Sequence, residues 1–133
     1  MILVDSSVWI DYFKGVNNPQ TEHLDDLLAE ADEELGVADF VVFEVLRGFS
    51  SPKAKRHAQT LLLSTRVVDI GGLDNALLAA EHYSALRQKG YTIASPIDVL
   101  LASYCITHHH TLLHRDADFD VLETLRGLKT WPH

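Results

Sequence analysis

Carboxylate residues stand beside or inside apolar segments of this sequence, where they could act together on a cation. Asp5 directly follows the apolar run at residues 1–4, and Asp116 follows the short apolar segment "TLLH". Asp98 opens the almost wholly apolar stretch "IDVLLASYCI", and Glu44 lies within "FVVFEVLR". Carboxylate oxygens are ligands that Mg²⁺ and Mn²⁺ prefer, and such ions polarise a phosphodiester and lower the pKa of a bound water. If the fold brings these four residues together, the sequence predicts a Mg²⁺ site, with Mn²⁺ as an alternative ion.

Asp5 and Asp98 also have a purely structural interpretation as helix caps. Asp5 precedes Ser6, Ser7 and an apolar pattern of helical period, and Asp is favoured just before the first turn of a helix. The segment "SPID" places Ser95 at an N-cap and Asp98 in the first turn, which is close to a capping box. The sequence leaves both interpretations open.

Glu44 has apolar neighbours on nearly every side of its predicted helix. A helix that is apolar all round is buried, so a buried glutamate is predicted. A buried carboxylate without a partner is costly and has a raised pKa, so a metal ion or a basic group is expected beside it. A salt bridge to Arg47 or another arginine is the structural alternative.

The segment "LLHRDADFD" carries three acids in five residues, more than helix capping requires. Asp116 is best placed, at the end of a strand, and a divalent cation would relieve the repulsion within the cluster. Asp118 is a candidate second ligand, whereas Asp120 is interpreted as a solvated helix residue.

Hydrophobic periodicity predicts the elements that must position these residues. Strands are predicted over residues 1–5, 34–38, 66–70 and 111–114 and around Leu128. Helices are predicted over residues 6–14, 19–31, 39–48, 51–64, 73–89, 95–109 and 117–125. Alternating strands and helices indicate a three-layer α/β/α fold with a mainly parallel central sheet. Ligands collect at the carboxyl ends of such strands, where the acids are expected.

Length and composition indicate one domain, residues 1–133, with a real core. The single cysteine, Cys105, excludes an internal disulfide and is interpreted as a small buried hydrophobic residue. No basic-plus-apolar signal segment opens the chain, and the longest nearly apolar stretch, residues 99–106, is well short of the ~20 residues of a membrane span. We expect a soluble cytoplasmic protein.

The distribution of charge says less about function than the acidic residues do. The net charge of −8 argues against a bulk electrostatic grip on nucleic acid. Local contacts with phosphates are still open to the basic residues, and the candidates are Lys53, Lys55, Arg56 and Arg115. The alternative for the three on the helix at 51–64 is a solvated helix face.

Three consecutive histidines at 108–110, with His114 close by, raise the question of a zinc site. Consecutive residues on a helix point in different directions, so they cannot all bind one tetrahedral ion without unwinding. A polar helix end is the favoured interpretation.

Four motifs occur in order across almost the whole chain: "VDSSVWIDYF", "FEVLRG", "IDVLLAS" and "LLHRDADF". Together they resemble the PIN-domain ribonucleases, and specifically the VapC-type toxins of prokaryotic toxin–antitoxin pairs. The resemblance implies an α/β/α fold and a Mg²⁺-dependent endoribonuclease that cuts single-stranded RNA. It maps the catalytic, metal-binding acids onto Asp5, Glu44, Asp98 and Asp116, with Asp118 as an accessory ligand and Ser6 as a supporting hydroxyl.

The resemblance also implies a partner, a small antitoxin whose tail places an arginine or lysine among the acids. We expect its apolar side chains to lie in a groove between the helix at 19–31 and "SVWIDYF", with two such grooves on a homodimer. The sequence departs from the family at His114, where many relatives carry threonine or serine. A packed strand residue is the favoured interpretation of His114, and a role in orienting water, in place of the hydroxyl, is the alternative.

Three other functions share some of these features. A phosphatase with an aspartyl nucleophile also starts with a strand-end Asp, but it usually has a second aspartate two positions on, where this chain has Ser7. A nuclease acting on DNA flaps would share the acids. A binding-only module would have lost them, and none is lost here.

Overall fold

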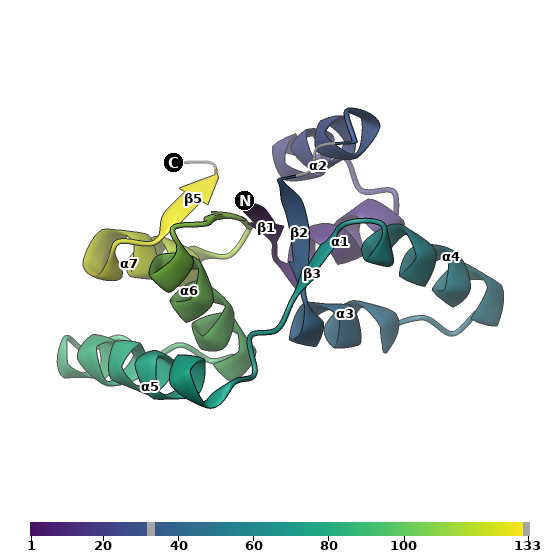
Figure 1. Cartoon of the computed structure of the whole chain (residues 1–133). Helices are drawn as coiled ribbons and strands as arrows, with labels where there is room; N and C mark the ends of the chain where they lie inside the picture. Colours follow the sequence, from purple (N-terminus) through teal and green to yellow (C-terminus); the bar gives the residue numbers. More distant parts are fainter. Residues whose placement is uncertain (32–33, 132–133) are drawn as a thin grey trace.

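The chain folds around one parallel β-sheet in the computed structural model, which describes residues 1–31 and 34–131 (Figure 1). The sheet has five strands in the order β3-β2-β1-β4-β5, and each neighbouring pair is parallel. The strands are β1 (Ile2–Val4), β2 (Leu35–Ala38), β3 (Arg66–Val68), β4 (Thr111–Leu113) and β5 (Lys129–Trp131). The helices are α1 (Ser6–Phe13), α2 (Pro19–Ala29), α3 (Asp39–Leu46), α4 (Pro52–Leu63), α5 (Leu73–Gln88), α6 (Pro96–His108) and α7 (Ala117–Arg126).

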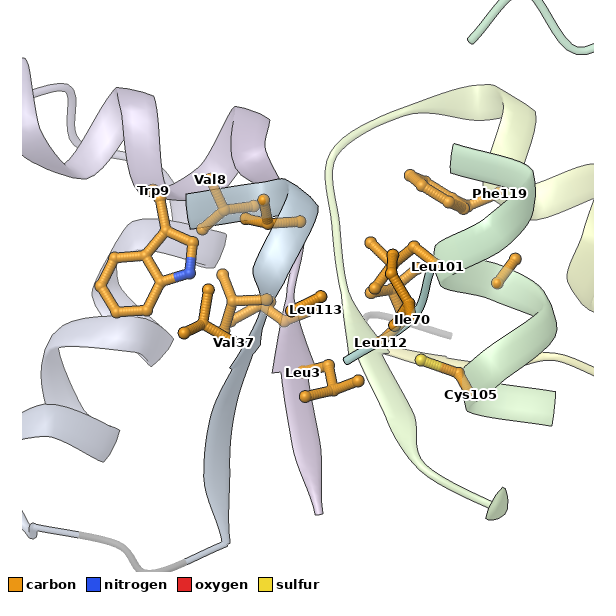
Figure 2. Close-up of a cluster of buried hydrophobic side chains, with 14 of the residues drawn as sticks. Leu3, Val8, Trp9, Val37, Ile70, Leu101, Cys105, Leu112, Leu113 and Phe119 are labelled. Carbon is orange, nitrogen blue, oxygen red and sulfur yellow. The ribbon is translucent and has the colours of Figure 1, made fainter. Parts of the chain in front are cut away.

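The sheet separates two groups of helices. Helices α1 to α4 lie on one side of the strands, and α5, α6 and α7 lie on the other (Figure 1). Apolar side chains fill both interfaces, with Val8 and Trp9 of α1 on one side and Leu101, Cys105 and Phe119 on the other (Figure 2). Because helices cover both faces, the central strands are apolar throughout and do not alternate. The predicted α/β/α fold with a parallel sheet is confirmed.

The predicted strands and helices are all present, and only their ends differ. The third strand ends at Val68, two residues early, because the Asp39 carboxylate takes the backbone N–H of Ile70 at 3.0 Å. The predicted edge strand begins just after Leu128, as β5. No helix within residues 1–31 and 34–131 is long and apolar enough to cross a membrane.

Candidate active site

The four predicted acids gather at the carboxyl edge of the sheet. β1 and β4 are parallel neighbours, so Asp5 and Asp116, which follow them, leave the sheet at the same edge. Asp98 lies in the first turn of α6, and Glu44 lies in α3, directly after β2. The negative charges of Asp5, Asp116 and Glu44 all raise the pKa of Asp98, so the fold has brought them within electrostatic reach.

Asp5 serves as a cap and keeps a free oxygen at the same time. It is the N-cap of α1, and its Oδ2 accepts the backbone N–H of Ser7 at 3.3 Å and the Ser7 hydroxyl at 2.6 Å. Oδ1 is buried and has no hydrogen-bond partner. Burial raises the pKa of this carboxyl, which is only 3% exposed. Ser7 was not predicted as a site residue, and its only signal in the sequence was its position two residues after an aspartate.

The capping interpretation of Asp98 holds only in part, because the residue does lie in the first turn of α6, where a negative charge is favourable. Ser95 occupies the N-cap position of α6, but its side chain makes no cap hydrogen bond, so the predicted capping box is not formed. Asp98 is nevertheless 9% exposed, and burial is the largest cause that raises its pKa to about 7. The neighbouring carboxylates, Asp5 first among them, raise it further. A carboxylate held among other carboxylates in this way needs a cation to be fully ionised at neutral pH.

Glu44 is half-buried, so the prediction of a buried glutamate was wrong in degree. The sheet covers only part of α3, and Phe43, beside Glu44, is 61% exposed. Partial burial and the charge of Asp5 raise the pKa of Glu44, while a hydrogen bond from the Ser6 side chain lowers it. Arg47 lowers it slightly, but its guanidinium lies over the Phe43 ring, 5.6 Å from the centroid. Oε1 of Glu44 is buried without a hydrogen-bond partner.

The acids of the "LLHRDADFD" segment differ in their surroundings. Asp116 is the N-cap of α7, and its Oδ1 accepts the backbone N–H of Asp118 at 2.9 Å. Both residues are half-buried, and the charge of Asp118 also contributes to the raised pKa of Asp98. Asp120 is exposed, as predicted for a solvated helix residue.

The oxygen donors of the four acids are of the kind that a hard divalent cation prefers. All candidate ligand atoms are carboxylate oxygens, two of them, Asp5 Oδ1 and Glu44 Oε1, are buried without partners, and the carboxylates repel one another. Among the residues that the structure describes, no three His, Cys, Asp or Glu side chains form a ready-made metal-binding group. A cation would therefore be held after side-chain rotation or partly through water, as Mg²⁺ usually is.

The chain and its fold match known proteins. A protein-family model described as "PIN domain" matches residues 2–125. The chain belongs to the PIN domain family. It is 29% identical over 129 residues to VapC ribonuclease Mb1587 of Mycobacterium bovis and to ribonuclease VapC11 of Mycobacterium tuberculosis. Each alignment covers 97% of this chain and 96% of the relative.

Solved structures support the PIN fold. FitAcB from Neisseria gonorrhoeae matches with a TM-score of 0.75 at 21% identity, over 98% of this chain and 96% of that one. VapBC2 from Rickettsia felis, bound to a DNA fragment from its promoter, matches with a TM-score of 0.72 at 20% identity, over 98% and 97% of the two chains. The predicted family is thus confirmed.

The basic residues proposed for phosphate contacts fall into two groups on this PIN domain. Lys53, Lys55 and Arg56 are exposed at the start of α4, and the same end of the helix helps to line the groove described below. Arg115 precedes Asp116 at the site, and its Nη1 lies 3.2 Å from Oδ2 of Asp11. A phosphate would have to compete with Asp11 for Arg115.

The predicted apolar groove between α1 and α2 was wrong. Trp9 of α1 and Leu24 of α2 pack fully into the core, and the hollow left between the two helices is small, about 210 Å³, and largely polar. An apolar groove of about 460 Å³ lies instead between α1, α3 and the start of α4. Its walls include Ile10, Phe13 and Phe49, and Glu44 of the acidic cluster also lines it.

The histidines at 108–110 form a polar helix end, as interpreted. His108 is the last residue of α6, and His109 caps it in the left-handed conformation, with φ of 58°. The rings of His108 and His110 stack 5.8 Å apart, and His108 also lies against Tyr104. Cys105 is fully buried, and burial raises the pKa of its thiol to about 12, so it is a core residue as predicted.

Proposed function

We propose that this PIN domain is a Mg²⁺-dependent endoribonuclease that acts in the cytosol as the toxin of a VapBC-type toxin–antitoxin pair. The observation that carries the proposal is the convergence of Asp5, Glu44, Asp98 and Asp116. Burial first, and then the charges of the other three acids, raise the pKa of Asp98 to about 7. Similarity along almost the whole chain to proteins named VapC ribonucleases supports RNA as the substrate.

The acids would hold Mg²⁺ or Mn²⁺ as its direct or water-mediated ligands, with Asp118 as an accessory. When bound, the ion supplies positive charge that lowers the pKa of a water and stabilises the departing oxygen of an RNA phosphodiester. Ser7 holds the Asp5 carboxylate through two hydrogen bonds, and Ser6 is the proposed supporting hydroxyl beside Glu44, whose pKa it lowers. Asp98 must lose its proton to become a ligand, and no side-chain nucleophile takes part. Arg115, Lys53, Lys55 and Arg56 are proposed to contact the RNA backbone.

The groove between α1, α3 and α4 is the proposed seat of an antitoxin tail. Ile10, Phe13 and Phe49 offer apolar surface to one face of a peptide helix. Glu44 stands in the wall of the groove, so a peptide seated there could place a lysine or arginine among the repelling acids and block the site. The net charge of −8 favours a basic partner.

Homodimer formation is proposed on a different surface. Leu73 and Leu77 of α5 are 75% and 60% exposed, and the same helix lines an apolar hollow of about 490 Å³ together with α6. Exposed apolar area of this kind is typical of an interface between subunits. Light scattering on the purified protein tests it, and a monomer across the micromolar range would contradict it.

The central test replaces single carboxylates. Asp5→Asn and Asp98→Asn each remove a negative charge at nearly constant size, so each should abolish RNA cleavage and the growth arrest that follows induction, while the Tm stays the same or rises. Asp74→Asn changes an exposed carboxylate in the first turn of α5 and is the matched control, which should keep both activities. Full activity of both site variants would overturn the proposal.

The substrate and the ion are tested together. Single-stranded RNA, single-stranded DNA and a chromogenic phosphate ester are each incubated with Mg²⁺ or with chelator. We expect cleavage of RNA alone, supported by Mg²⁺ or Mn²⁺ and little by Ca²⁺, which is larger and accepts looser geometry. Cleavage of DNA would favour the flap-nuclease alternative, and turnover of the ester would favour a phosphatase. Activity that Zn²⁺ restores after treatment with EDTA, and that Mg²⁺ and Mn²⁺ do not restore, would point to the histidines.

The partner is tested by co-expression of the chain with the small reading frame beside its gene. We expect the two proteins to co-purify and the partner to relieve the growth arrest. If they do not co-purify, and induction of this chain alone leaves growth and translation untouched, the toxin assignment fails, although a nuclease could survive.

A further inference from the structure

His114 lies between the end of β4 and Asp116, and only 3% of it is exposed. Its Nδ1 accepts a hydrogen bond from the backbone N–H of Asp116 at 3.1 Å. A ring nitrogen that accepts a hydrogen bond carries no proton, so the proton of the neutral ring is on Nε2. The side chain of one residue therefore holds the backbone of the residue two positions later.

The hydrogen bond to His114 restrains Asp116, whose carboxylate both caps α7 and belongs to the acidic site. Oδ1 of Asp116 accepts the backbone N–H of Asp118 at 2.9 Å and caps α7, while the negative charge of Asp116 reaches Asp98 across the site. With its N–H bonded to His114 and Oδ1 bonded to Asp118, the backbone and the carboxylate of Asp116 are both constrained. The other oxygen, Oδ2, is then left for a cation.

The imidazole is itself well held. Its ring lies against that of Phe119, with the centroids 5.0 Å apart, and Phe119 is fully buried in the first turns of α7. The backbone N–H of His114 also bonds to the carbonyl of Trp131 in β5 at 3.4 Å. His114 thus ties the end of β4 to both α7 and the neighbouring strand, which gives its Nδ1 a defined place.

We propose that His114 is a positioning residue, and that its Nδ1 holds Asp116 in the orientation that the cation requires. The inference rests on the proposed function, because it assumes a cation among the acids. The other ring nitrogen makes no comparable bond. Nε2 is buried without a hydrogen-bond partner, and its nearest carboxylate oxygen, Oδ1 of Asp120, is 3.7 Å away.

Four substitutions separate the two ring nitrogens. His114→Asn places an amide oxygen near the position of Nδ1, and His114→Thr offers a hydroxyl that can accept from the N–H two residues on. His114→Gln carries its amide out to the position of Nε2, and His114→Leu has no acceptor. The Asn and Thr variants should keep the bond to Asp116, while the Gln and Leu variants should lose it.

The first measurement needs no metal. Exchange of the Asp116 amide proton, followed by NMR on the full chain in EDTA, should be slow in the wild-type protein and in the Asn and Thr variants. In the Gln and Leu variants we expect it to be at least about tenfold faster. Equal exchange in the Asn and Gln variants would overturn the inference, and this comparison stands even if the Leu variant does not fold.

The second measurement is the rise in Tm on titration with Mg²⁺. The Gln and Leu variants should bind Mg²⁺ about 10- to 100-fold more weakly than the Asn and Thr variants, the usual cost of losing a group that orients a ligand. If the wild-type protein shows no response to Mg²⁺, the proposed function fails. If the wild-type protein responds and the Leu variant responds equally, only the role of His114 fails. Equal loss in all four variants would assign the effect to ring packing on Phe119 and would also overturn the inference.

Discussion

Replacement of Asp98 by Asn should stabilise the metal-free protein at neutral and higher pH. The pKa of Asp98 is about 7 in the folded protein, because of burial and the charges of Asp5, Asp116 and Glu44, and its ordinary value is 3.8. Between these two pH values the folded state holds a proton that the unfolded state has lost. The free energy of unfolding therefore falls as pH rises from about 4 to about 7, and above about 7 the whole cost is present. Asn carries no charge and avoids the cost.

The size of the effect follows from the two pKa values. At about 1.4 kcal/mol per pKa unit, a pKa moved from 3.8 to about 7 costs up to about 4 kcal/mol at high pH. The charge of Asp98 also interacts favourably with the dipole of α6, by about 0.3–1 kcal/mol, and Asn loses this. We therefore expect Asp98→Asn to gain roughly 2–4 kcal/mol, which for a domain of this length raises the Tm by roughly 10 °C.

The assay is a set of thermal melts in EDTA from about pH 5 to about pH 8.5, with Asp74→Asn as the matched control on the exposed first turn of α5. The difference in Tm between Asp98→Asn and the wild-type protein should grow with pH, and the control difference should stay flat. Added Mg²⁺ should stabilise the wild-type protein more than the variant, since the variant has lost a ligand. A variant no more stable than wild type near pH 8 would refute the raised pKa of Asp98 and the cost of its charge in the folded protein.

Three further predictions concern single contacts. Ser7→Ala removes the 2.6 Å hydrogen bond to Asp5, so the pKa of Asp5 should rise and the acidic limb of the pH–rate profile of RNA cleavage should move to higher pH. Gly36→Ala should destabilise the protein by about 1–3 kcal/mol in urea melts, because a Cβ there would stand 2.8 Å from a backbone oxygen of β3. Gly72→Ala is the control, because a Cβ there meets nothing within 4 Å. It should cost no more than about 1 kcal/mol, the usual size of an N-cap preference, since Gly72 is the N-cap of α5. The Cys105 thiol should not react with a thiol reagent near pH 8 until the protein unfolds, since its pKa is about 12 and it is fully buried.

The elements and the strand-end acids could be predicted because their signals are local. Apolar runs of three to five residues and helical periodicity identified the strands and helices, and Asp5 and Asp116 were recognised where apolar strands stop. Helix caps, by contrast, depend on side-chain rotamers that the sequence does not specify. Ser95 stands at an N-cap without making a cap bond, so the absence of the predicted capping box could be seen only in the structure.

The exposure of α3 and the location of the groove could not be predicted from the pattern of apolar residues. Glu44 was predicted to be buried because its neighbours are apolar, yet the side chain of Phe43 is 61% exposed, since the sheet and its helices cover only part of α3. The apolar groove likewise lies between α1, α3 and α4, because Leu24 of α2 is used in the core. Apolar residues tend to be buried, but the element that packs against them depends on the tertiary structure.

The sequence by itself determined the order of strands and helices and the carboxylates that end or interrupt apolar segments, because hydrophobic period and turn residues act over a few positions. Only the tertiary structure decided that these carboxylates share one site. The strand order places β1 beside β4, so Asp5 and Asp116 leave the same edge of the sheet. Helix α3, which follows β2, brings Glu44 to them, and helix α6, which precedes β4, brings Asp98. The raised pKa of Asp98 comes from burial and from charges distant in sequence, and Coulomb energy depends on separation in space and on the local dielectric, neither of which a linear sequence contains.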